Sequence, residues 1–141
     1  MNVESLFSEL GVRWGLHLQS EQGAIKLVDN DNQDWYLECP PESPYLTIHT
    51  ALLPKPIREE ELAIWLTLNT DRTLMGNSWV GVNEEHLILG TTVPVEFIDV
   101  NLVENMMNNL YEQASNLKQR SEVPINTERE ENRVFYTGSF A

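Results

Sequence analysis

Residues 58–69 read REEELAIWLTLN, and this stretch does most to decide the fold. Its opening glutamates complement the positive end of a helix dipole, so the sequence predicts a helix that runs to about Asn69. Its apolar side chains fall on two faces, one formed by Leu62, Trp65 and Leu66 and the other by Ile64 and Leu68. Because one core cannot cover both faces, we predict that a second subunit covers the remaining face.

A hairpin and a long helix are predicted on the C-terminal side of this stretch. Residues 78–82 (SWVGV) and 86–95 (HLILGTTVPV) have the composition of strands, and the acidic segment 83–85 forms the loop between them. Asp99 can cap a final helix that ends near Ser121. An apolar stripe at helical spacing runs through Val103, Met106, Met107, Leu110, Ala114 and Leu117.

A helix and three strands are predicted on the N-terminal side. Residues 3–10 repeat apolar side chains at the spacing of a helix, and Gly11 follows as a candidate C-terminal cap. Residues 24–29 (AIKLVD) and 34–39 (DWYLEC) alternate like the strands of a hairpin, and residues 45–53 (YLTIHTALL) form a third strand. The complete order is helix, three strands, helix, two strands, helix. It predicts an α+β fold with a twisted, mainly antiparallel five-stranded sheet.

The chain length suits a single domain followed by a tail. Domains cluster near ~100–150 residues, and this chain has 141. Its C-terminal part is polar up to the run VFYTGSF at residues 134–140. Such a terminus is usually mobile unless its aromatic side chains dock, so we expect a domain at residues 1–121 and a flexible tail at 122–141.

The charge balance narrows the classes of partner. Nine Lys and Arg residues against 22 Asp and Glu residues leave a formal net charge of −13. This charge repels phosphate backbones and anionic lipid headgroups, so nucleic acid and membranes are poor candidate partners. No stretch approaches the ~20 apolar residues of a membrane span, and the first ten residues do not resemble a signal peptide. We therefore expect a protein that stays in the cytoplasm.

The sequence contains no motif that predicts catalysis or a bound cofactor. His17, His49 and His86 lie far apart and do not have the spacing of metal ligands. The single cysteine, Cys39, is best interpreted as a buried and inert core thiol. Nucleophile elbows and glycine-rich phosphate loops are absent from the sequence. We expect no enzyme, metal or cofactor, although a site assembled from scattered residues would leave no such motif.

The central part of the chain resembles a known family. The resemblance rests on four features of the sequence: Leu66–Asn69 at the helix end, Gly76, the two strands around the acidic turn in Trp79–Leu89, and the entry to the last helix at Pro94–Asp99. This pattern resembles the class I type III secretion chaperones, with their Tir-chaperone-like fold, across about residues 1–121. The chain departs from the family in a glycine-poor loop before residue 78 and in its long tail.

The resemblance implies a homodimeric chaperone. It would bind the N-terminal segment of one or more secreted effectors in extended form and keep it competent for secretion. A secretion ATPase or a regulator would be a further candidate partner, and no nucleotide would be needed for holding. The predicted dimer contacts are Trp65, Leu66, Leu68, Trp79 and Val80.

The bound effector, called the client below, would add a strand to a sheet edge and place side chains in apolar pockets. Backbone hydrogen bonds would supply affinity, and alternate side chains would supply specificity. The candidate contacts lie in the first helix and first hairpin: Val3, Phe7, Trp14, Ile25, Leu27, Trp35 and Leu37. Trp14 is the most prominent of them, because it is predicted in a loop between two glycines. Ordinary core packing is the alternative interpretation for each of these residues.

Two alternatives keep the fold and change the function. One is a chaperone-like protein that sequesters a transcriptional regulator of the secretion system. The other is the YbjN-type family of stress-linked proteins, which has a similar fold. The identity of the bound partner separates these alternatives from an effector chaperone, because function lies in the site and not in the scaffold.

Overall fold

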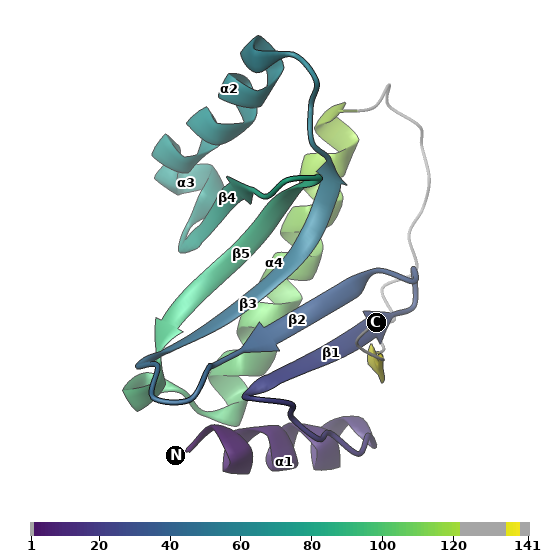
Figure 1. The fold of residues 1–141 in the computed structure, drawn as a ribbon, viewed down its shortest axis with the longest axis vertical. Helices are drawn as coiled ribbons and strands as arrows, with labels where there is room; N and C mark the ends of the chain where they lie inside the picture. The colour runs from purple at the N-terminus through teal and green to yellow at the C-terminus, as the bar shows by residue number, and fades with distance from the viewer. Residues whose placement is uncertain (1, 122–134, 139–141) are drawn as a thin grey trace.

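The computed structural model describes residues 2–121 and 135–138 and shows an α+β fold (Figure 1). Its strands are β1 (Ala24–Asp29), β2 (Asp34–Glu38), β3 (Tyr45–Pro54), β4 (Ser78–Val82), β5 (His86–Pro94) and β6 (Phe135–Thr137). Its helices are α1 (Val3–Trp14), α2 (Glu59–Thr67), α3 (Arg72–Met75) and α4 (Val100–Ser121), with 3₁₀ turns η1 (Leu68–Thr70) and η2 (Val95–Phe97). The predicted α+β class is confirmed.

The strands form one antiparallel sheet in the order β4-β5-β3-β2-β1-β6. Consecutive hairpins join β1 to β2 and β4 to β5, and β3 pairs with β5 in the middle of the sheet. The predicted count of five strands is wrong, because residues 135–137 of the predicted tail add β6 beside β1. Residues 122–134 and 139–141 of that tail lie outside the described residues.

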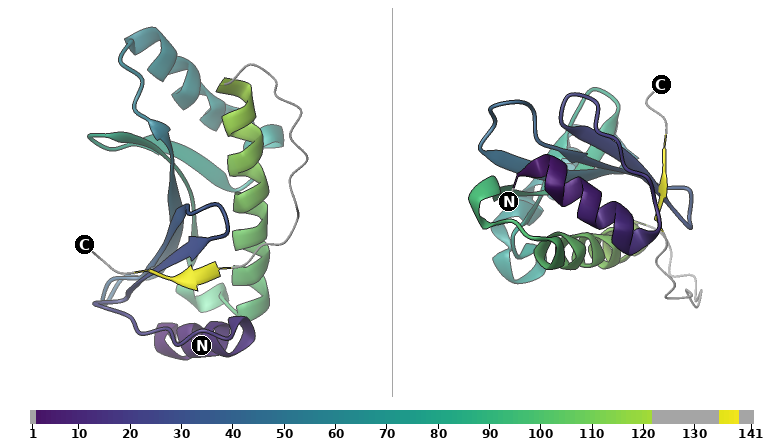
Figure 2. Two further views of the ribbon diagram at one scale, coloured as in Figure 1. Left: turned by 90° about the vertical axis from the view of Figure 1, so that its right-hand side faces the viewer. Right: turned by 90° about the horizontal axis from the view of Figure 1, so that it is seen from below.

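Helix α4 lies along one face of the sheet, and α1 lies across one end of the molecule, beside the start of α4 (Figure 1 and Figure 2). Alternate residues of the strands point to that face, as the buried and half-buried positions of β1, β2 and β3 show. The sheet residues Leu27, Trp35, Leu37, Leu46, Ile48, Leu87 and Leu89 are fully enclosed, as are Val103, Met107 and Leu117 of α4. The predicted apolar stripe of α4 therefore packs on the sheet, with Met106 at its half-buried margin.

A buried carboxylate organises the turn between β1 and β2. Asp29 is 2% exposed, and its Oδ1 accepts hydrogen bonds from the backbone N–H groups of Asp31 at 2.8 Å and Gln33 at 3.0 Å. Its Oδ2 accepts a third from Trp35 Nε1 at 2.9 Å. These bonds offset the cost of taking the carboxylate out of water. They hold the hairpin so that the Trp35 indole lies inside the core.

The opposite face of the sheet carries half-buried polar and aromatic side chains. Tyr36 stacks on His49 with ring centroids 5.2 Å apart, and His49 Nε2 lies 3.2 Å from Glu38 Oε1. The Trp79 indole lies flat over Gly90, where an added Cβ would come within 2.6 Å of the ring. Glycine is therefore required at position 90 to let this indole lie against the sheet.

Candidate functional site

The β1 edge of the sheet holds an extended segment of the same chain. Strand β6 pairs antiparallel with β1, with Val28 opposite Tyr136 and Asp29 opposite Phe135. Beyond the strand, the Gly138 N–H donates to the Lys26 carbonyl at 2.9 Å. The edge thus accepts an added strand through backbone hydrogen bonds.

An aromatic socket behind this edge receives Phe135. The Phe135 side chain is 5% exposed, and its ring centroid lies 5.3 Å from that of Trp14 and 6.2 Å from that of Trp35, where the two rings meet edge to face. Tyr136 points the other way and is 50% exposed. Edge-to-face contacts of this kind add to the gain from burying apolar area. The Trp14–Trp35 socket therefore selects an aromatic side chain at one position of the added strand.

Most of the predicted client contacts are core residues. Phe7, Ile25, Leu27 and Leu37 are at most 2% exposed, so core packing replaces the expectation that they contact a client directly. Trp35 is also buried, but its ring lies against Phe135 of β6 and so lines the socket at this edge. The alternation of β1 and β2 shows that these strand residues share one face, but only the position of the helices shows that this face is covered.

Val3 and Trp14 are the two candidate client contacts that keep exposed surface, and both are half-buried. Trp14 was predicted in a loop, yet it is the last residue of α1. Gly11 does not end the helix, which continues to Trp14. Gly11 is buried, and an added Cβ there would lie 2.6 Å from the Leu16 carbonyl oxygen. Gly15, with φ 67°, is the actual C-terminal cap. This cap ends the helix where the Trp14 indole reaches Phe135.

The β4 edge is closed by a side chain. Asn69 Oδ1 accepts from the Val80 N–H at 2.7 Å, and Asn69 Nδ2 donates to the Val80 carbonyl at 2.8 Å. Arg72 Nη2 donates to the Ser78 carbonyl at 3.1 Å. The Asn69 carboxamide thus makes the pair of bonds that a neighbouring strand would otherwise make. A second chain cannot pair with Val80 through its backbone while Asn69 holds this position.

Several exposed apolar side chains belong to α2 and the segments near it, and α2 lies at the end of the molecule away from α1 (Figure 1). Ile57 is 100% exposed, Ile64 69% and Val82 40%. The predicted dimer contacts Leu66, Leu68 and Trp79 are half-buried, whereas Trp65 at 8% and Val80 at 3% are buried within the chain's own core. Trp65 and Val80 therefore offer little surface to a second subunit, because periodicity does not reveal which apolar side chains the chain's own core covers.

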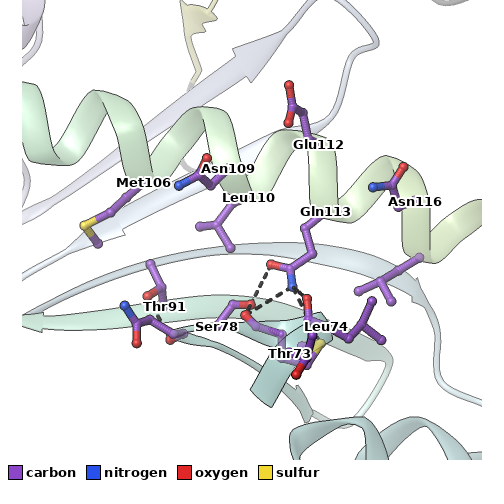
Figure 3. A pocket seen from close by; sticks show the side chains of 14 residues that line it. Thr73, Leu74, Ser78, Thr91, Met106, Asn109, Leu110, Glu112, Gln113 and Asn116 are labelled. Atoms are coloured by element: carbon purple, nitrogen blue, oxygen red, sulfur yellow. Dashed lines mark hydrogen bonds between the residues drawn. The ribbon is translucent and has the colours of Figure 1, made fainter. Parts of the chain in front are cut away.

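A cleft of about 440 Å³ with a mixed polar and apolar lining lies between α3, β4 and α4 (Figure 3). Gln113 Nε2 donates to the carbonyls of Leu74 at 3.1 Å and Met75 at 3.2 Å, and Ser78 Oγ is bonded to Gln113 Oε1. Glu112 points away from these groups (Figure 3). A carboxamide is not a base, so Gln113 cannot activate the Ser78 hydroxyl. The arrangement ties α4 to β4 and does not form a nucleophile–base pair.

The described residues contain few perturbed titratable groups. A hydrogen bond from His49 lowers the pKa of Glu38 below its usual range. Burial raises the pKa of the Cys39 thiol, which favours the unreactive protonated form predicted from the sequence. Within residues 2–121 and 135–138, no three His, Cys, Asp or Glu side chains are grouped to hold a metal ion. No helix in this part of the chain is long and apolar enough to cross a membrane.

An α+β chain with an antiparallel sheet, helices on one face and an edge that takes an extended segment has the architecture of a polypeptide-binding protein. Comparison with known families matches residues 4–118 to the Tir chaperone protein (CesT) family. The chain belongs to this family, and the resemblance to type III secretion chaperones is confirmed. No curated protein sequence matches the chain.

Solved structures share the fold at low sequence identity. The ExsC–ExsE complex aligns with a TM-score of 0.72 and 17% identity, covering 83% of this chain and 91% of that one. The HopA1–SchA chaperone–effector complex aligns with a TM-score of 0.67 and 16% identity, covering 82% and 92%. The Yersinia pestis type III secretion chaperone SycH, solved with a fragment of YscM2, aligns with a TM-score of 0.62 and 17% identity, covering 82% and 99%.

Proposed function

We propose that this protein is a homodimeric chaperone that binds the N-terminal segment of one or more type III secretion effectors in extended form. The observation that carries the proposal is the β1 edge, where an extended segment is already held by backbone pairing and by one buried aromatic side chain. Strand addition of this kind holds a polypeptide without requiring it to fold. Membership of the Tir chaperone family supports the type of client.

The proposed work is binding and not catalysis, and it takes place in the bacterial cytoplasm before export. A formal net charge of −13 favours this role in two ways. It keeps a protein with exposed apolar surface soluble, and it attracts basic segments of a client. No nucleotide or metal is assigned to the holding step.

The homodimer is proposed to form through the apolar surface of Ile57, Ile64 and Val82, together with Leu66, Leu68 and Trp79. Ile64 of α2 and Val82 of β4 lie on elements that contact each other, and contiguous exposed apolar surface usually marks an interface. Asn69 occupies the β4 edge at Val80, so the contact is made by side chains and not by a continuous sheet. A two-fold axis would bring the same surface of both subunits together.

Substitution Ile64→Glu tests this interface. Ile64 is 69% exposed, so the fold tolerates the charge, whereas a dimer would have to bury it without a partner. We expect the wild type to be a dimer at micromolar concentration and Ile64→Glu to be a monomer by light scattering. Ser8→Glu adds the same charge at an exposed site on α1 and should remain dimeric. A monomeric wild type, or a dimeric Ile64→Glu variant, would contradict the proposal.

The client is tested by affinity capture from the native organism followed by mass spectrometry. We expect a secreted effector, bound through its N-terminal region, to be recovered with the wild-type protein. Recovery of a transcriptional regulator without any secreted protein would favour the regulatory alternative. Recovery of neither from cells that are secreting would count against a secretion role.

A further inference from the structure

The backbone N–H and carbonyl groups of β1 that point away from β2 can bond only one added strand at a time. Cys39 N–H donates to the Gly23 carbonyl and Asp29 N–H to the Gln33 carbonyl, so the odd-numbered positions bond toward β2. The even-numbered positions face outward, and the first of them, Ala24, already exchanges two 3.0 Å hydrogen bonds with Glu21. The remaining positions, Lys26 and Val28, are opposite Gly138 and Tyr136. With β6 in place, the edge is full.

The attachment of β6 depends on one side chain. Phe135 is buried, whereas Tyr136 and Thr137 are exposed, so the strand gains little apolar burial beyond a single ring. This gain is set against the conformational entropy lost when residues 135–138 are ordered. Short edge elements with few buried contacts are among the first to open locally. Strand β6 is therefore a detachable part of the sheet.

The fit of β6 also defines a sequence pattern. The Trp14–Trp35 socket takes an aromatic ring at position 135. Three positions later, a Cβ added at Gly138 would lie 3.0 Å from Lys26 Cγ and 3.2 Å from Val28 Cγ2, closer than ordinary contacts. The edge thus favours an extended segment with an aromatic residue followed, after two exposed positions, by glycine.

We propose that residues 135–138 are an intramolecular occupant of the client-binding edge, which an extended client segment of the same pattern must displace before it can pair with β1. This inference rests on the proposed function for the nature of the client. It makes the free chain self-protected, because an open edge and an empty aromatic socket would otherwise invite non-specific pairing. The apparent affinity for a client is then the intrinsic affinity multiplied by the fraction of molecules in which β6 is detached.

The exchange can be measured without knowing the client. The probe is a fluorescein-labelled peptide with the sequence of residues 133–141, RVFYTGSFA, added to the full-length protein. Phe135→Ala empties the socket, so we expect this variant to bind the probe about tenfold or more tightly than the wild type. Tyr136→Ala removes an exposed aromatic of the same strand and should leave probe affinity within about twofold of the wild type. Fluorescence anisotropy reports both affinities, and circular dichroism shows that each variant is folded.

A covalent lock provides a second test that does not depend on Phe135→Ala. Val28 and Tyr136 are directly opposite each other, and opposed residues of antiparallel strands lie within the range that a disulfide can bridge. In the variant Val28→Cys/Tyr136→Cys, we expect the oxidised form to lose probe binding and the reduced form to keep it. Cys39 is buried and does not compete for the bridge.

Two results would overturn the inference: a folded Phe135→Ala variant that binds the probe no better than the wild type, or an oxidised lock that binds it as well as the reduced form does. If Phe135→Ala does not fold, the comparison of the oxidised and reduced Val28→Cys/Tyr136→Cys variant is sufficient to test the inference. Because the probe comes from this chain, a negative result leaves the dimer and effector experiments unaffected. Failure to capture an effector would contradict the proposed function, but it would not change the result of the peptide-binding experiment.

Discussion

The two edges of the sheet are closed by different means. At β4, the Asn69 side chain bonds both backbone groups of Val80, and it comes from a residue only eleven positions away in the sequence. At β1, the cover is the strand β6, which comes from the far C-terminal part of the chain. A local cap loses less loop-closure entropy when it forms than a remote segment does. This difference agrees with the proposal that the cover of β1 can detach, whereas Asn69 stays on β4.

The largest expected effect comes from removing the support behind the β1 edge. Trp35 is fully buried, bonds Asp29 through its indole N–H and lines the socket for Phe135. We expect Trp35→Ala to lower the free energy of unfolding by about 3–5 kcal/mol, because it leaves a large cavity. Urea denaturation followed by circular dichroism measures this loss.

Trp79→Ala is the matched control at the β4 edge. Its indole is half-buried on the opposite face of the sheet and lies over Gly90. A half-buried ring leaves no closed cavity, so its removal should cost clearly less than Trp35→Ala. Equal losses for the two variants would contradict the view that the Trp35 side of the sheet contains the main core.

An intermediate effect is expected from opening the β4 edge. Asn69→Ala leaves the Val80 N–H and carbonyl without their partner, which costs about 1–3 kcal/mol where such groups stay away from water. The exposed edge should also promote self-association, which light scattering would detect as an increase in mass over time. Asn77→Ala, at an exposed asparagine just before β4, should do neither. A monodisperse and fully stable Asn69→Ala variant would show that the side chain is not the cap.

The smallest effect is expected on the sheet face between the two edges. The hydrogen bond from His49 lowers the pKa of Glu38 in the folded chain below its value in the unfolded chain. The pair therefore stabilises the fold above the ordinary pKa of glutamate, and this gain is lost as the pH falls through the lowered pKa. The Glu38 side chain is 41% exposed, so solvent screening limits the gain to about 0.5 kcal/mol or less.

Comparison of Glu38→Gln with the wild type measures this contribution. The difference in urea midpoint should be small at pH 7 and should shrink as the pH falls below the ordinary pKa of glutamate, until the wild-type carboxylate is protonated and the difference disappears. Glu42→Gln, at an exposed neighbouring position, should show no such change with pH. A difference that grows as the pH falls would have the wrong sign for a lowered pKa.

The dimer contacts on α2 could be predicted from the sequence only in part. The two apolar faces of α2 were visible in residues 58–69, yet the spacing alone did not show which face meets the sheet. The structure buries Trp65, leaves Leu66 half-buried and exposes Ile64, so most of the surface available to a second subunit lies on the face that carries Ile64. In the same way, alternation in β1 and β2 located apolar side chains correctly, and only the position of α4 showed that they form the core.

The sequence by itself determined the α+β class, the order of the main helices and strands, and the family, because these depend on local periodicity, turn residues and composition. The tertiary structure decided how the two edges are closed. The pairing of β6 with β1 and the capping of Val80 by Asn69 join residues that no local pattern connects. Backbone groups at a sheet edge accept any strand or carboxamide of suitable geometry, so their actual partner is selected only when the whole chain has packed.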